Sequence, residues 1–195
     1  MNNRKRAVII ILIVLGAMLL SLAANLIISA VQKSAHPIRY ESYVEVYSSQ
    51  YNVPEYIVYA VINTESGFDA SLESATGERG LMQISPEVFA LISSEQHLDE
   101  KIDADALFDP EISIRYGIYY LRCLFNEFQS WDTAIAAYSA GEDTVNEWLD
   151  NIKYSSDRKN LTGIPEKETA AYVKKVNDAI SYYKTTYYRN GVSVK

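Results

Sequence analysis

The chain has 195 residues, 48% of them hydrophobic, and a formal net charge of −7. This length allows one ordinary domain with a short appendage. The acidic balance excludes the basic surface that a nucleic-acid-binding protein presents to phosphates, so we expect no nucleic-acid partner.

The N-terminal segment has the composition of a membrane anchor. Arg4, Lys5 and Arg6 precede residues 7–31, which contain no charged side chain. As a helix with a rise of about 1.5 Å per residue, this stretch would extend roughly 37 Å, enough to cross a lipid bilayer with some tilt. Because the cations lie before the apolar stretch, the positive-inside rule predicts a cytoplasmic N-terminus. We therefore expect a single-pass protein of the cell membrane.

The predicted anchor divides the chain into two parts. Residues 1–36 form the cytoplasmic tip and the transmembrane helix, and residues 37–195 form an extracytoplasmic domain. Cleavage as a signal peptide after small residues near Ala24 or Ala30 is the alternative, although the apolar stretch is longer than a usual signal sequence. Residues 1–36 carry four of the 18 Lys and Arg and none of the 25 Asp and Glu, which leaves the domain with a net charge of −11.

The domain is predicted to be all-α. Tyrosines recur at helical spacing up to Tyr51, and Pro54 is suited to the first turn of the helix that follows. Residues 69–80 and 153–163 are polar and are expected to be loops, whereas 95–109 are acidic and irregular. The apolar periodicity and the prolines predict helices over residues 38–51, 54–65, 86–92, 110–128, 131–139, 142–149 and 165–188.

Glu65 is the first candidate for chemistry. It follows an apolar run over residues 56–62 and precedes Gly67, which is able to end a helix. Burial and the negative end of a helix dipole would both raise the pKa of such a carboxyl, as a general acid requires. Two simpler interpretations stay open: a solvated glutamate at a helix end, and a buried strand over residues 56–62.

Other chemistry has little support in the sequence. Cys123 is the chain's one cysteine, lies among apolar residues and is expected to be a buried structural thiol. The two histidines, His36 and His97, have no cysteine or acidic cluster at ligand spacing, so we expect neither a zinc site nor another metal or cofactor. An outside domain without a disulfide is weakly typical of a Gram-positive host.

Four motifs carry a family resemblance. In chain order they are E-S-G-F at 65–68, S-A-T-G-E-R-G-L-M-Q-I at 74–84, A-A-Y-S-A-G at 136–141 and I-P-E-K-E-T-A-A-Y-V at 164–173. Together they resemble the catalytic domain of the soluble lytic murein transglycosylases, members of the lysozyme-like superfamily. The resemblance covers roughly residues 40–185 and implies a lysozyme-like α-helical fold.

The resemblance also implies a reaction. The family cleaves the β-1,4 bond between N-acetylmuramic acid and N-acetylglucosamine in peptidoglycan and leaves a 1,6-anhydro ring. Glu65 would be the single catalytic acid and base, and the N-acetyl group of the substrate would supply the help that a second carboxylate gives in ordinary retaining glycosidases. Asp69, four residues later, is expected to be a loop carboxylate. No cofactor is implied.

The remaining motif positions are candidate substrate contacts. Gln83 offers an amide, and the serines and tyrosines offer hydroxyl groups to a sugar. Structural roles are the alternative at three of them: Met82 in the core, Ser66 as a helix cap and Tyr172 in packing. Glu168 resembles the family's second cleft glutamate. The full set is Ser66, Ser74, Met82, Gln83, Tyr138, Glu168 and Tyr172.

The motifs depart from the family at three positions, and two other functions stay open. Ser139 replaces the usual Asn, Ala170 replaces Arg and Ser85 replaces Met, which puts subsite contacts and substrate preference in doubt. Goose-type lysozymes share the fold and a comparable glutamate, so hydrolysis is one alternative. The other is a wall-tethered scaffold or wall-opening component of an envelope secretion or conjugation apparatus.

Overall fold

The computed structural model describes residues 3–95, 102–189 and 192–193. The chain separates into two compact units, Met1–Pro37 and Ile38–Lys195. The first unit is one helix, α1 (Asn3–Ala35). Within it, Ile10–Ala35 is long and apolar enough to cross a membrane, and none of that span is buried within the protein.

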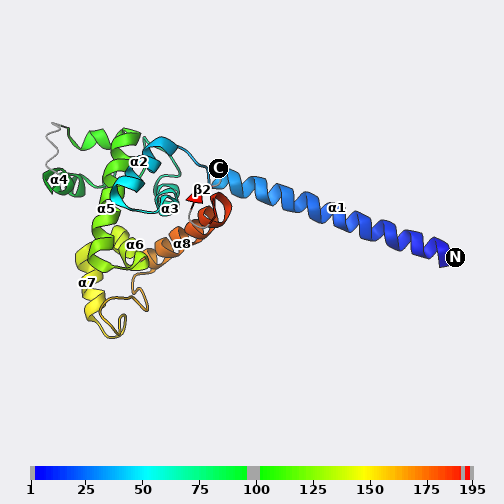
Figure 1. The fold of residues 1–195 in the computed structure, drawn as a ribbon. Coiled ribbons are helices and arrows are strands. Elements are labelled where there is room, and N and C mark those ends of the chain that lie inside the picture. Colours follow the sequence, from blue (N-terminus) through cyan, green and yellow to red (C-terminus); the bar gives the residue numbers. More distant parts are fainter. Residues whose placement is uncertain (1–2, 96–101, 190–191, 194–195) are drawn as a thin grey trace. The chain divides into compact units, whose positions relative to one another are not determined.

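The second unit is α-helical, as predicted. Long loops separate α3 from α4 and α7 from α8, and a hairpin of two-residue strands comes after the last helix (Figure 1). The elements are α2 (Glu41–Tyr51), α3 (Glu55–Glu65), α4 (Pro86–Glu95), the 3₁₀ helix η1 (Ala104–Phe108), α5 (Pro110–Phe128), α6 (Trp131–Ala140), α7 (Glu142–Asp150), α8 (Lys167–Tyr187), β1 (Tyr188–Arg189) and β2 (Val192–Ser193).

Helix α5 is the central element of this unit. Asp109 caps its start: one carboxylate oxygen accepts hydrogen bonds from the backbone N–H groups of Glu111 at 2.8 Å and Ile112 at 3.2 Å. Its apolar stripe, Ile114, Ile118, Leu121 and Leu124, is fully buried. The helix runs along the unit and packs against α2, α4, α6 and η1 (Figure 1).

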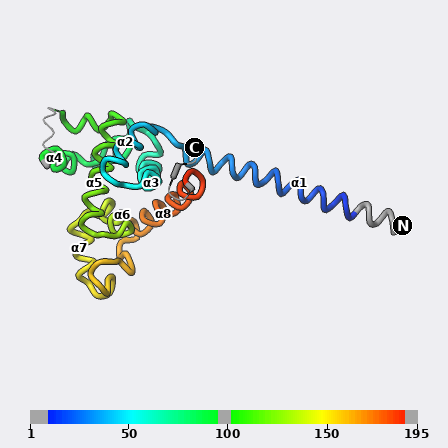
Figure 2. The backbone as a smooth tube through the Cα atoms, in the orientation of Figure 1, coloured from blue at the N-terminus to red at the C-terminus, as the bar shows by residue number. Residues whose placement is uncertain are grey.

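Helices α3 and α8 lie side by side (Figure 2). Hydrogen bonds at both ends show that they run antiparallel. At one end the phenol of Tyr188, just after α8, donates a hydrogen bond to Glu55 at the start of α3. Near the other end Tyr172 of α8 meets Glu65 at the end of α3. Helix α3 is buried along most of its length. Its pairing with α8 therefore places the C-terminal end of a core helix next to the N-terminal part of α8.

Two expectations about single residues differ from the structure, and a third is not tested by it. Pro54 has an extended backbone and precedes α3 as its cap residue, because the helix begins one position later. Cys123 is partly buried rather than a fully buried core thiol. His97 lies outside the described residues.

Candidate active site

Glu65 is the last residue of α3, so the helix prediction is confirmed and the strand alternative is wrong. The chain turns immediately afterwards: Gly67 has φ 59° and Phe68 has φ 69°. A left-handed conformation costs glycine little, which explains the glycine two residues after the carboxylate. The turn starts the loop over residues 66–85, which returns to the carboxylate.

The carboxyl of Glu65 keeps its proton up to about neutral pH. Burial raises the pKa of Glu65 from 4.5 to about 7, because an ionised carboxylate is poorly solvated there. A hydrogen bond from Tyr172 and the charge of Lys175 oppose this effect, whereas the negative charge of Glu78 adds to it. The simple reading of Glu65 as a solvated helix-end residue does not fit this environment.

A cavity of about 190 Å³ opens beside this carboxyl. Its walls come from the end of α3, the loop over residues 66–85, the end of α6 and the first turns of α8. Larger cavities of about 380 and 430 Å³ lie near the start of α3, but Glu65 lines neither. The lining residues of the smaller cavity are Glu65, Ser74, Glu78, Gln83, Tyr138, Ser139 and Tyr172.

Two phenols fix the geometry around the carboxyl. The hydroxyl of Tyr172 donates to Oε1 of Glu65 at 2.5 Å, and the hydroxyl of Tyr138 donates to the carbonyl oxygen of Met82 at 2.7 Å. Burial raises the pKa of both tyrosines well above 10, and the nearby Glu65 raises it further. Both phenols therefore stay protonated. Because Oε1 of Glu65 accepts the hydrogen bond from Tyr172, we assign the proton of the neutral carboxyl to Oε2.

Gln83 lines the cavity through a constrained side chain. It adopts φ 48°, and its amide nitrogen donates to the carbonyl oxygens of Leu72 at 3.0 Å and Gly80 at 2.8 Å. These bonds use both amide hydrogens. A sugar hydroxyl or N-acetyl N–H would thus meet Gln83 as an acceptor.

Three predicted contact residues do not line this cavity. Met82 is fully buried, and its side chain packs against Gly117 of α5. Ser66 donates a hydrogen bond to the carbonyl oxygen of Leu81 at 2.8 Å, which ties the end of α3 to the loop. Glu168 is exposed in the first turn of α8. The structural roles considered for Met82 and Ser66 fit these positions better than direct contact does.

Replacing Ser66 with alanine should lower the free energy of unfolding by about 1 kcal/mol. The change leaves the carbonyl oxygen of Leu81, a fully buried residue, without this donor. Urea unfolding checks the prediction, with the exposed Ser71 changed to alanine as the control. Equal stability of the Ser66 variant and the wild type would contradict the bracing role.

The structure adds two residues to the site. Both line the cavity: Ser139 stands out in the sequence only as a departure from a motif, and Glu78 lies inside a motif that implies no role for it. The signal that the sequence offers for Glu78 is the spacing of two hydroxyl residues and a carboxylate, Ser74-x-Thr76-Gly77-Glu78. Glu168, which the sequence placed in the cleft, lies outside this cavity, so the second carboxylate of the site is Glu78.

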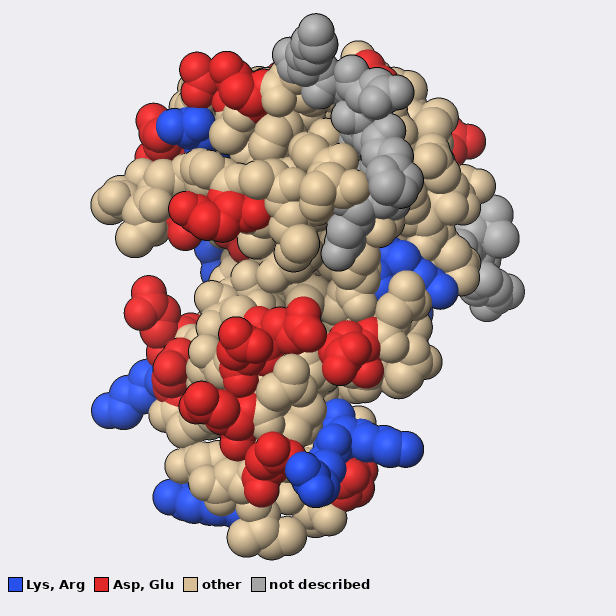
Figure 3. All heavy atoms as spheres, turned by 90° about the vertical axis from the view of Figure 1, so that its left-hand side faces the viewer, with Lys and Arg blue, Asp and Glu red and all other residues tan. Residues whose placement is uncertain are grey.

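The face of the molecule shown in Figure 3 carries more acidic than basic side chains. This agrees with the net charge of −11 for the residues after 36, calculated from the whole sequence. A polyanion would be repelled by this surface, whereas a neutral glycan would not. Among the residues that the structure describes, no group of three or more His, Cys, Asp or Glu is placed to hold a metal ion.

Comparison with known proteins connects this geometry to a family. The family model for the transglycosylase SLT domain matches residues 42–161. The soluble lytic murein transglycosylase of Escherichia coli strain K12 is 30% identical over 150 residues, which cover 76% of this chain and 23% of that protein. Membrane-bound lytic murein transglycosylase C of Serratia proteamaculans is 28% identical, with 84% of this chain and 51% of that protein covered.

Solved structures agree with the sequence comparison. The 70-kDa soluble lytic transglycosylase of Escherichia coli superposes with a TM-score of 0.70 at 28% identity, covering 77% of this chain and 25% of that one. An inactive glutamate-to-glutamine mutant of the lytic transglycosylase Slt from Pseudomonas aeruginosa gives 0.69 at 25% identity, covering 82% and 26%. The chain thus spans from about a quarter to half of the length of these relatives. It belongs to the transglycosylase SLT domain family.

Proposed function

We propose that this protein is a membrane-anchored peptidoglycan lytic transglycosylase that cleaves the bond between N-acetylmuramic acid and N-acetylglucosamine. The observation that carries the proposal is the largely buried carboxyl of Glu65, whose pKa of about 7 suits proton transfer near neutral pH. It lies in a cavity lined by hydroxyl, phenol and amide groups, within an SLT domain.

The reaction begins with proton donation. Glu65, neutral and with its proton on Oε2, donates to the glycosidic oxygen while the bond from that oxygen to C1 of the muramic acid breaks. Tyr172 keeps the carboxyl in one orientation through its bond to Oε1. The N-acetyl group of the substrate stabilises the positive charge that develops at C1, which replaces the nucleophilic carboxylate of other retaining enzymes.

The second step restores the acid. The carboxylate of Glu65 takes the proton of the C6 hydroxyl as the C6 oxygen bonds to C1, which closes the 1,6-anhydro ring. No water is consumed, and Glu65 is again neutral. Gln83, Ser74 and Tyr138 bind and orient the sugar in the cavity. Ser66, Met82 and Glu168 contribute through the shape of the site or at more distant subsites.

Digestion of insoluble peptidoglycan tests the proposed function. The full chain in detergent should release soluble glycan fragments from purified cell-wall sacculi, whereas Glu65→Gln should release almost none. If the Glu65→Gln protein binds sacculi as well as the wild type does, the loss of fragment release is a loss of the cleavage step and not of substrate binding. Equal release by the two proteins would refute the role of Glu65, and no release by either would favour the scaffold in an envelope secretion or conjugation machine.

The proposed anchor has its own consequence. The relatives called membrane-bound and the apolar helix α1 fit membrane association, and we propose one crossing with the N-terminus in the cytoplasm. The domain would then act on wall close to the membrane. Such restraint by position needs no contact between the anchor and the site.

Removing residues 1–37 should leave turnover of soluble glycan strands unchanged, because Glu65 and all other residues that line the cavity belong to the second unit. The same truncation should move the protein from the membrane fraction to the soluble fraction of the host cell. Turnover measured on equal amounts of folded protein, with circular dichroism as the folding control, checks the first expectation. A truncated protein that stays with membranes would refute the anchor.

A further inference from the structure

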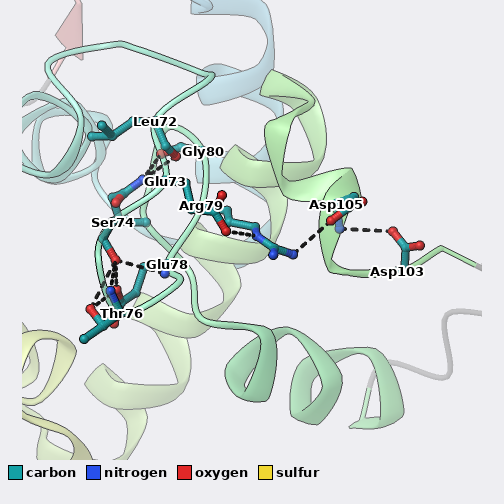
Figure 4. Close-up of polar contacts among 10 residues, drawn as sticks. Leu72, Glu73, Ser74, Thr76, Glu78, Arg79, Gly80, Asp103 and Asp105 are labelled. Atoms are coloured by element: carbon teal, nitrogen blue, oxygen red, sulfur yellow. Dashed lines mark hydrogen bonds and ion pairs between the residues drawn. The ribbon is translucent and has the colours of Figure 1, made fainter.

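Glu78 is a second carboxylate in the cavity of Glu65. It lies in the loop that returns from the end of α3, and its Oε2 accepts hydrogen bonds from two hydroxyl groups. One comes from Ser74 and the other from Thr76, the latter at 2.6 Å (Figure 4). The carboxylate is therefore oriented by its own loop.

The loop is itself held in place next to Glu78. The guanidinium of Arg79 donates to Glu73 and to Asp105 of η1, each at 3.0 Å, as Figure 4 shows. The backbone of Arg79 also exchanges two hydrogen bonds with Ile84, at 3.1 and 3.2 Å. Since Arg79 is fixed through both its backbone and its side chain, the loop segment that carries Glu78 is held in one position beside the cavity.

We propose that Glu78 is a positioning residue for the reaction of Glu65: its fixed negative charge adds to burial in keeping Glu65 protonated, and its carboxylate orients the Ser74 hydroxyl toward one acceptor. The inference rests on the proposed function, since it concerns the acid that starts glycan cleavage. Glu65 alone exchanges protons with the substrate in this scheme, but a second carboxylate lies in the same cavity.

The charges around Glu65 support this role. Partial burial opposes ionisation of Glu78, but the hydrogen bonds from Ser74 and Thr76 outweigh it and lower the pKa of Glu78, which is ionised at neutral pH. Its charge raises the pKa of Glu65. Lys175 of α8 acts in the opposite direction, and so does the hydrogen bond from Tyr172.

The orientation of Ser74 follows from its hydrogen bonds. Its hydroxyl hydrogen is donated to Glu78, while its oxygen accepts from the backbone N–H groups of Thr76 at 3.2 Å and of Glu78 itself at 3.1 Å. Without an acceptor at residue 78, the hydroxyl hydrogen is able to rotate. A sugar group bound to Ser74 would then meet a less defined partner, which affects KM rather than the pH dependence.

The pH profile of kcat/KM for the full chain in detergent tests the proposal, with soluble glycan strands as substrate. In the wild type, kcat/KM falls as the pH rises through the pKa of Glu65, because the acid is lost. Glu78→Gln should displace this fall to lower pH by about half a pH unit, which lowers kcat/KM about threefold at about pH 8 and little at about pH 5. Lys175→Met should displace it to higher pH.

Two variants serve as controls. Glu78→Asp keeps the charge and should keep the wild-type position of the fall. Glu73→Gln makes the same chemical change on the same loop outside the cavity, leaves Arg79 its bond to Asp105 and should not move the profile. Glu78→Ala is the second neutral variant and should move the profile as Glu78→Gln does.

The outcomes separate this inference from the function on which it rests. A wild type that releases no product refutes the proposed function. An active wild type whose pH profile is unchanged in both neutral variants overturns the role of Glu78. A uniform loss at every pH, not restored by Glu78→Asp, also overturns it, because a merely structural residue would behave in that way.

Discussion

Replacing Glu65 with glutamine should lower the rate of glycan cleavage by about 1,000-fold or more. General acid–base catalysis typically contributes about 10²- to 10⁴-fold, and here one carboxyl serves as the acid of the first step and the base of the second. Glutamine keeps the shape of the side chain and an oxygen that accepts from Tyr172, so the cavity should persist. Initial rates of fragment release at equal protein concentration measure the effect.

Asp69→Asn is the matched control for this experiment. Asp69 lies four residues after Glu65 but is exposed, and its carboxylate accepts from the N–H and hydroxyl of Ser71 in its own turn. Its amide variant should cleave glycan at close to the wild-type rate. A large loss in Asp69→Asn with little loss in Glu65→Gln would reverse the assignment of the acid.

The same Glu65→Gln change should stabilise the folded protein at alkaline pH. The folded state raises the pKa of Glu65 from 4.5 to about 7, so between these values it binds more protons than the unfolded state and loses stability as the pH rises. The loss is complete above the folded pKa and corresponds to about 3 kcal/mol. Glutamine does not titrate and avoids it.

Urea unfolding at several pH values measures this difference. Both tryptophans, Trp131 and Trp148, lie in the second unit, so their fluorescence follows the unfolding of that unit in the full chain. The variant should match the wild type at about pH 4 and exceed it by about 3 kcal/mol at about pH 8. A constant difference at all pH values would show that Glu65 keeps its ordinary pKa. Stability gained where activity is lost is expected when an active site holds an unfavourable group.

Local signals were enough to predict most of the fold. Asp109 followed by Pro110 marks the start of α5, and the structure shows the aspartate capping that helix. Apolar periodicity likewise located α6 and α7 to within a residue or two. The sequence predicts Pro54 inside α3, whereas the structure has it as the cap residue: proline suits both positions, and periodicity does not separate them.

The site depended on contacts between distant residues. Glu65, Gln83 and Tyr138, which the motifs single out, line one cavity. Spacing alone does not reveal that Tyr172 donates to Glu65 from more than 100 residues away. The sequence does not single out Glu78, because a charged residue in a loop with several glycines usually faces solvent. Only the folded loop shows the hydroxyls of Ser74 and Thr76 holding its carboxylate beside the acid.

The end groups of the released glycan test the central claim most directly. Mass spectrometry of fragments from purified peptidoglycan, digested by the full chain in detergent, distinguishes two products. Our account predicts muropeptides that end in 1,6-anhydro-N-acetylmuramic acid, since the carboxylate of Glu65 takes its proton from the C6 hydroxyl and no water enters. Fragments heavier by one water, with reducing N-acetylmuramic acid ends, would show hydrolysis and contradict it.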